Sequence, residues 1–103
     1  MSQSTLAVLR VLLDAEGQPT YGLEIGKSAD IASGTLYPIL DRLVREGWVR
    51  SHWEDTDPSR EGRPRRRYYQ LTGVGEVEAV RALQRAHART TPRVWPVPAT
   101  QGR

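Results

Sequence analysis

The sequence contains no cysteine, so it cannot form a disulfide framework or a metal site built on thiolates. Long apolar runs are missing as well, since Val11–Leu13 is far shorter than the roughly 20 residues that a membrane-spanning helix needs. No basic segment followed by an apolar one opens the chain, as a secretion signal would. With 103 residues there is room for one domain with a modest core. We therefore expect a single soluble domain in the cytoplasm.

Lysine is also scarce: fourteen of the fifteen basic residues are arginine, and five of these lie between Arg60 and Arg67. The net charge of +3 is modest, so the cluster is more informative than the total. The planar guanidinium group suits phosphates and guanine edges. The cluster therefore favours a nucleic-acid partner, although a short basic segment can also be no more than a solvated loop.

Helical periodicity and capping residues predict four helices, and alternating residues predict two strands. The predicted helices, with their caps, are Ser2 or Ser4 to about Ala15, Thr20 to 29, Ala32 or Ser33 to Gly47, and Thr72 to about Thr90. The strands are 48–54 and 66–71, around a polar loop at 55–64. The segment 91–103 contains three prolines and is expected to be an extended or mobile tail.

The order of these elements, three helices followed by strand, loop and strand, is that of a winged helix-turn-helix. Only the short connection 30–32 separates the second and third helices, as that motif requires. Gly22, Gly26 and Ala29 lie near one another on the second helix and would let another helix approach closely. The predicted fold is mainly α with a small β-hairpin (α+β). Residues 1–90 form the winged domain, which includes the last helix at 72–90.

The third predicted helix has one apolar face and one polar face. Leu36, Leu40 and Leu43 form the apolar stripe. The opposite face carries Thr35, Pro38, Asp41, Arg42 and Arg45, with Tyr37 at its margin. Pro38 would be the fifth helical residue if Ser33 is the N-cap and the third if Thr35 is. In either case it is expected in or near the first turn, where a helix tolerates proline.

The polar face of this helix is the candidate surface for reading DNA. Gly34 and Thr35 carry little bulk, and the free N–H groups at the helix start favour an anion such as phosphate. Arg42 could take O6 and N7 of guanine, whereas Thr35 and Tyr37 are better placed for a phosphate or a thymine methyl group. Alternatively, Arg42 pairs with Glu46, four residues further along, and faces water.

Three blocks of sequence resemble the PadR family of bacterial transcriptional regulators. They are "YGLEI" at Tyr21–Ile25, "SGTLYPILDRLVREGWV" at Ser33–Val49 and "GRPRRRYYQLTGVG" at Gly62–Gly75. The resemblance implies a homodimer that binds a palindromic operator on double-stranded DNA, usually as a repressor. It also implies a recognition helix at 33–46 and a wing at 53–68. The expected DNA-binding residues are Tyr21, Ser33, Gly34, Thr35, Tyr37, Arg42, Arg63, Arg65 and Arg66.

The chain resembles the short branch of that family, which keeps a single helix after the wing. Some short members bind flat aromatic drugs at the dimer centre through a tryptophan on the last helix. Here the tryptophan beyond the wing is Trp95, which follows Pro92 and is expected outside that helix. The likeness, together with an alanine-rich last helix, makes a small apolar or aromatic effector between subunits an expectation.

The first and last predicted helices carry broad apolar surfaces, which a domain of this size has few places to bury. A surface helix usually needs an apolar arc of roughly 100°, and the first helix exceeds it. A two-fold partner subunit would cover the excess. The expected dimerisation residues are Leu6, Leu9, Leu13, Val80 and Leu83.

Catalytic and metal chemistry find little support in the sequence. His52, Glu54, Asp55 and Asp57 could be written as a metal cluster, but they fall on a strand end and a loop. Ser33 and Ser51 stand in no nucleophile signature, and no glycine-rich phosphate loop occurs. We therefore expect no enzyme, no cofactor and no metal. The alternative function is a winged-helix protein-interaction module whose basic wing grips an acidic protein partner.

Overall fold

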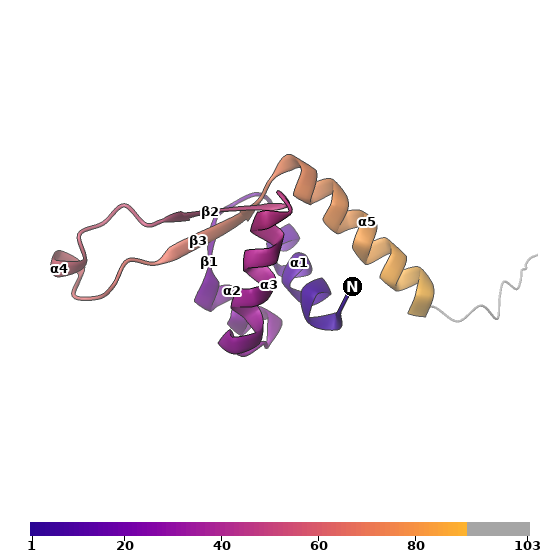
Figure 1. The fold of residues 1–103 in the computed structure, drawn as a ribbon, viewed down its shortest axis with the longest axis horizontal. Coiled ribbons are helices and arrows are strands. Elements are labelled where there is room, and N and C mark those ends of the chain that lie inside the picture. Colours follow the sequence, from indigo (N-terminus) through magenta and orange to yellow (C-terminus); the bar gives the residue numbers. More distant parts are fainter. Residues whose placement is uncertain (91–103) are drawn as a thin grey trace, which may run out of the picture.

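The computed structural model describes residues 1–90, and the predicted tail at 91–103, Trp95 included, lies outside the described residues. Three helices, a small antiparallel sheet and a long last helix follow one another along the chain (Figure 1). Their bounds are α1 Gln3–Asp14, β1 Thr20–Tyr21, α2 Gly22–Ala29, α3 Ser33–Arg45, β2 Val49–Trp53, α4 Pro58–Glu61, β3 Arg67–Leu71 and α5 Gly73–Thr90. The wing extends from one side of the helices, and α5 runs away on the other.

Two of the predicted caps are confirmed by hydrogen bonds. Ser2, rather than Ser4, caps α1, because its Oγ accepts from the backbone N–H of Thr5 at 3.1 Å. Thr72 caps α5, since its Oγ1 accepts from the N–H of Gly75 at 3.0 Å; the same hydroxyl donates to the Gly47 carbonyl at 2.7 Å, between α3 and β2. Each bond satisfies a donor that the first helical turn leaves without an internal partner.

The predicted cap of the second helix is wrong. Tyr21 occupies the N-cap position of α2 and makes no side-chain capping bond. Thr20 and Tyr21 instead form the short strand β1, which pairs with β3 so that Tyr21 lies opposite Tyr68. The sheet therefore has three strands in the order β1-β3-β2, one more than the predicted hairpin. A two-residue strand is too short to leave an alternating pattern in the sequence.

The register of the hairpin separates its two faces. Val49 pairs with Leu71, and Trp53 pairs with Arg67 at the outer end. Since successive strand residues point to opposite faces, alternate positions on β2 and β3 face the helices. The buried core joins these positions to α1, α2, α3 and α5. It comprises Leu6, Val8, Leu9, Leu12, Ile25, Leu36, Leu40, Leu43, Val49, Tyr69, Leu71, Ala79 and Ala82.

Glycines on α2 let neighbouring groups approach closely, as the sequence predicted. A Cβ on Gly26 would lie 3.1 Å from both the Ile31 carbonyl oxygen and Cδ2 of Leu36. A Cβ on Gly22 would lie 2.8 Å from the hydroxyl of Tyr37. Both positions are buried, so α3 packs directly on the backbone of α2. The turn between these helices is made by Asp30, which adopts a left-handed conformation with φ of 58°.

Pro38 lies deeper in its helix than the sequence predicted. The N-cap of α3 is Ala32, so Ser33 is the first helical residue and Pro38 the sixth. A proline at this position removes the hydrogen bond to the Gly34 carbonyl in the second turn. Gly34 and Pro38 are both exposed, so solvent can hydrate that carbonyl.

Among residues 1–90, no helix combines the length and apolarity that crossing a bilayer would require.

Candidate nucleic-acid interface

The outer face of α3 is exposed along its length. Leu36, Leu40 and Leu43 anchor the helix in the core, which fixes the direction of the opposite face. The exposed residues are Ser33, Gly34, Thr35, Tyr37, Pro38, Asp41, Arg42 and Arg45. Every DNA-contact residue predicted on this helix is therefore accessible to a partner.

Tyr37 is held at the edge of this face by the start of α2. Its ring lies against Gly22, where any side chain would collide with it. The tyrosine remains 38% exposed. Gly22 therefore has a packing role: it makes room for an aromatic side chain of α3 that remains open to solvent.

Arg42 does not make the ion pair that the sequence offered as its alternative. Its Nη2 donates to Oγ1 of Thr5 on α1 at 3.3 Å, which is a long hydrogen bond. Within residues 1–90, no ion pair joins Arg42 to Glu46. The guanidinium is thus exposed and weakly held, with donors free for another acceptor.

The wing has its own local structure, which the sequence did not predict. Asp57 caps the short helix α4, because its Oδ1 accepts from the N–H of Ser59 at 3.0 Å, and Gly62 ends it with φ of 71°. Nε of Arg65 donates to the Thr56 carbonyl at 2.7 Å across the loop. Arg65 and Arg66 are both exposed, as expected for DNA contacts.

Arg63 corrects the prediction for the wing arginines. It forms a two-pronged salt bridge with Glu54, with Nη1 2.7 Å from Oε1 and Nη2 3.2 Å from Oε2. The Glu54 side chain is only 7% exposed, so it does not belong to a free loop as the sequence suggested. Arg63 therefore faces the interior of the wing, and its charge is already paired.

Aromatic side chains stack beside this salt bridge. The rings of Tyr21 and Tyr68 lie 4.5 Å apart, and the His52 ring lies 4.9 Å from Tyr68 on the same face of the sheet. The guanidinium of Arg66 covers the Tyr21 ring at 4.8 Å. The Tyr21 hydroxyl donates to Oε2 of Glu54 at 3.2 Å. Tyr21, predicted to contact DNA, is thus half-buried, and its ring and hydroxyl are engaged by Tyr68, Arg66 and Glu54.

Charge and hydrogen bonding shift the pKa values of Glu54, Arg63 and Tyr68, and that of Arg63 is raised by its hydrogen bond to Glu54. The Arg63 guanidinium holds the pKa of Glu54 down at about 2, and bonds from the Arg66 N–H and the Tyr21 hydroxyl act in the same direction. The hydrogen bond to Tyr21 raises the pKa of Tyr68, and burial adds to the effect. Glu54 is therefore a fixed anion at neutral pH.

A groove of about 590 Å³ lies between the wing and the helices α2 and α3. Trp53, which the sequence did not single out, is 59% exposed and stands at its wall with the Arg67 guanidinium 5.5 Å from its ring. The available signal was its spacing of four residues from the apolar Val49, which places both on the same face of β2. The other lining residues are Tyr21, Gly22, Leu23, Glu24, Lys27, Tyr37, Asp41, Arg65, Arg66, Arg67 and Tyr69.

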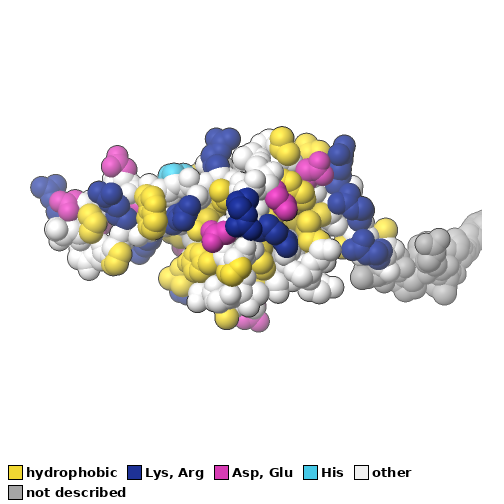
Figure 2. All heavy atoms as spheres, in the orientation of Figure 1, with side chains coloured by type: hydrophobic (Ala, Val, Ile, Leu, Met, Phe, Trp, Pro, Cys, Tyr) yellow, Lys and Arg dark blue, Asp and Glu magenta, His cyan; other side chains and the backbone are white. Residues whose placement is uncertain are grey.

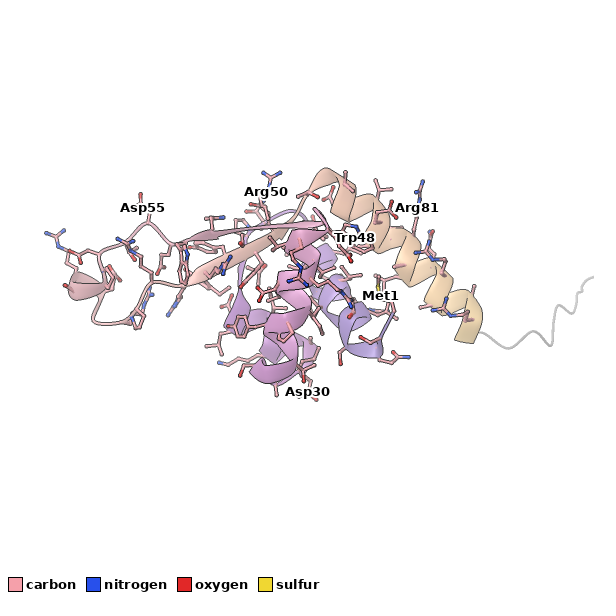
Figure 3. The ribbon with its side chains drawn as sticks, in the orientation of Figure 1. Met1, Asp30, Trp48, Arg50, Asp55 and Arg81 are labelled. Atoms are coloured by element: carbon pink, nitrogen blue, oxygen red, sulfur yellow. The ribbon has the colours of Figure 1, made fainter. Side chains whose placement is uncertain are left out.

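Basic residues are spread over the surface around this groove. Figure 2 shows dark-blue side chains on the wing, over the central helices and along α5. Arg50 points from β2 away from the helices, and Arg81 projects from α5 (Figure 3). Lys27, Arg65, Arg66 and Arg67 line the groove, against the acidic residues Glu24 and Asp41. The groove wall therefore carries a net positive charge suited to a polyanion.

The candidate metal cluster at 52–57 is not assembled. Glu54 is turned toward Arg63, and residues 1–90 contain no group of three side chains that could hold a metal ion.

The two predicted dimerisation helices, α1 and α5, differ in how much of their apolar surface is buried within a single chain. Leu6 and Leu9 of α1 are buried in the core at 7% and 0% exposure, which corrects their assignment as residues that need a partner subunit. A charge at Leu9 would therefore disrupt the fold of the single chain. On α5, Val80 stays 43% exposed. Leu13 and Leu83 are half-buried.

Comparison with protein families identifies the family, and comparison with solved structures supports the fold. The sequence profile of the transcriptional regulator PadR-like family matches residues 8–81. The chain is similar to smu.1704 from Streptococcus mutans UA159, with 28% identity and a TM-score of 0.64 over 82% of this chain and 80% of that one. A search of curated proteins found no match.

Two further solved structures are similar over shorter shares of their own length. Reduced AbfR bound to DNA is 28% identical with a TM-score of 0.67, over 90% of this chain but 60% of AbfR. PcaV from Streptomyces coelicolor, in complex with its natural ligand, is 22% identical with a TM-score of 0.66 over 86% of this chain and 57% of that one. At that identity the PcaV likeness shows the fold alone.

Proposed function

Since the chain belongs to the PadR-like family of transcriptional regulators, we propose that it binds operator DNA in a sequence-specific manner, as a homodimer that represses a neighbouring gene. One observation carries the proposal: the exposed face of α3 and the basic wing border the same groove. A surface that presents a helix and a positive ridge together fits one groove of a duplex and its adjacent phosphates.

The two parts would contribute differently to binding. The start of α3 combines small exposed residues with free backbone N–H groups, so it can enter the major groove and meet a phosphate. The guanidinium of Arg42, held by one long hydrogen bond to Thr5, would donate to O6 and N7 of a guanine. Arg65 and Arg66 would contact the backbone, which adds affinity without choosing bases.

The outer face of α5 supports the dimer. Val74, Val77 and Val80 are 61%, 51% and 43% exposed and recur at helical spacing on one face. Exposed valines in a row are an apolar strip that a second copy of the helix would cover. Two recognition helices in such a dimer would meet half-sites about 10 base pairs apart, or a multiple of that.

A small apolar or aromatic effector between the subunits stays a prediction of this proposal. PcaV, a neighbour in fold, was solved with its natural ligand. Binding at the dimer centre would shift α5 of one subunit against the other and change the separation of the two recognition helices.

Footprinting on the DNA immediately upstream of the protein's own gene tests the proposal. We expect a protected site with two-fold symmetry, and a binding constant that falls steeply as salt rises. A scrambled duplex of equal length should bind far more weakly. Equal binding to both duplexes, or none to either, would contradict the proposal, and salt-sensitive capture of an acidic protein instead would favour the interaction-module alternative.

A further inference from the structure

The two strands of the wing separate just beyond the pair Trp53 and Arg67. The Glu54 N–H still donates to the Arg66 carbonyl at 2.8 Å, one step past the last strand pair. From there to Arg66 the chain follows a loop that contains only the short helix α4. The Glu54–Arg63 salt bridge spans this loop close to its base.

Glu54 has all of its acceptor capacity in use. Its two oxygens accept two bonds from Arg63, one from the Arg66 N–H at 3.2 Å and one from the Tyr21 hydroxyl at 3.2 Å. A carboxylate offers about four such positions. These donors come from β1, from the loop and from the residue just before β3, so one carboxylate ties together three parts of the chain.

Arg63 has correspondingly little left for a phosphate. Both Nη atoms face Glu54, Nη1 also donates to the Pro64 carbonyl at 3.2 Å, and the Glu61 carboxylate lies 3.9 Å from Nη2. The Arg63 side chain is 30% exposed, and the charge of its guanidinium is balanced by Glu54. Arg65 and Arg66, in contrast, are exposed and line the groove between the wing and the helices.

The contacts of the salt bridge fall on both sides of Arg65. Arg63 holds the Pro64 carbonyl just before it, and Glu54 holds the Arg66 N–H just after it. The backbone that carries Arg65 is therefore fixed at two points from the same ion pair. A cation that is already held in place loses less conformational entropy when it binds.

Resting on the proposed function, we propose that Glu54 and Arg63 are positioning residues for DNA binding: their salt bridge holds the wing so that Arg65 and Arg66 meet the phosphates, and Arg63 itself contacts none. An acidic residue thus strengthens the binding of a polyanion. Simple summation of charge predicts the opposite sign, because removing Glu54 would make the wing more positive and release Arg63.

The test measures operator binding across a salt series for E54Q, R63K and the double variant, with R65A as the control for a true phosphate contact. We expect E54Q and R63K each to weaken binding about tenfold, and the double variant to be no weaker than either alone. R63K keeps the charge but loses the two-pronged geometry, so a phosphate contact would survive it. The slope of log K against log salt should fall by about 1 in R65A and stay unchanged in R63K.

Thermal melts followed by circular dichroism would establish that each variant folds. Amide hydrogen exchange of residues 55–65 in the free protein should be faster in E54Q and R63K than in wild type. Unchanged or tighter operator binding by E54Q would overturn the inference and leave the proposed function intact. Operator binding by R63K as tight as that of wild type would also overturn it, because a simple phosphate contact survives that change, and so would additive losses in the double variant. Failure of the wild-type protein to bind any duplex would instead remove the proposed function itself.

Discussion

The recognition helix and the wing are adjacent parts of one surface, but they are held in place by different forces. Helix α3 is anchored by three buried leucines, Leu36, Leu40 and Leu43, and its outer face makes few internal contacts. The loop of the wing buries no apolar side chain of its own, and the carboxylate of Glu54 at its base holds it through Arg63 and the Arg66 N–H. Apolar burial is insensitive to pH and salt, whereas a salt bridge depends on both. The position of α3 should therefore change little with pH and salt, whereas the position of the wing should depend on both.

Breaking the anchor of the helix should have the largest effect. Leu40→Ala removes a side chain with no exposed surface, and we expect it to lower the free energy of unfolding by about 2–5 kcal/mol. Urea denaturation measures the change. Thr35→Ala on the exposed face of the same helix is the control and should stay within about 0.5 kcal/mol of wild type. Equal losses in both variants would mean that α3 is not anchored by its leucine stripe.

A charge on the exposed strip of α5 should separate the subunits without unfolding them. Val80→Glu would bury an unpaired carboxylate in a dimer interface, so the dimer dissociation constant should rise by about 100-fold. Sedimentation equilibrium measures the constant. Ser59→Glu adds the same charge to an exposed position on α4, at the opposite end of the molecule from α5 (Figure 1), and should leave the dimer intact. A wild-type protein that stays monomeric throughout the micromolar range would refute the dimer.

Removing the guanidinium on α3 should affect recognition. Arg42→Ala is expected to cost about 1–3 kcal/mol on the operator and little on random DNA if the side chain reads a base. Thr5→Val removes its internal acceptor, which the proposal predicts to be harmless or mildly favourable for binding. Fluorescence anisotropy measures the affinity of each of the two variants for the operator and for the random duplex. Equal losses on both duplexes for Arg42→Ala would make it a phosphate contact.

The smallest effect is the pH dependence of the wing. The pKa of Glu54 is lowered to about 2 from 4.5, so its ionised form stabilises the fold fully above 4.5 and this contribution is lost as the pH falls toward 2. Comparison of E54Q with wild type at pH 5 and pH 2.5 should show a difference in melting temperature at the higher pH that shrinks at the lower one. A difference that persists unchanged at pH 2.5 would argue against an ionised Glu54.

The same contrast explains what could be predicted from the sequence. Helix positions, the caps Ser2 and Thr72 and the close approach at Gly22 and Gly26 follow from periodicity and local chemistry, and all are seen. The N-cap of α3 is Ala32 rather than Ser33, so Pro38 lies one residue further into the helix than a Ser33 cap would place it. Local rules work where neighbours in sequence are also neighbours in space.

The failures involve contacts between distant segments. Strand β1 exists only because it meets β3, which is 47 residues away at the pair Tyr21 and Tyr68. Arg63 looked like any other arginine of the cluster, and only the folded hairpin brings Glu54 to it. Leu9 was assigned to a partner subunit because no local pattern distinguishes a leucine buried by its own chain from one buried by a second copy.

The central claim is that α3 selects the DNA sequence while the wing supplies affinity for the phosphates, and one salt titration tests it most directly. Operator and random-duplex affinities are measured for wild type, Arg42→Ala and Arg65→Ala at several salt concentrations. Arg42→Ala should lower the ratio of operator to random affinity while keeping the salt slope, and Arg65→Ala should keep the ratio while lowering the slope by about 1. The reverse pattern, or two variants that behave alike, would contradict the account.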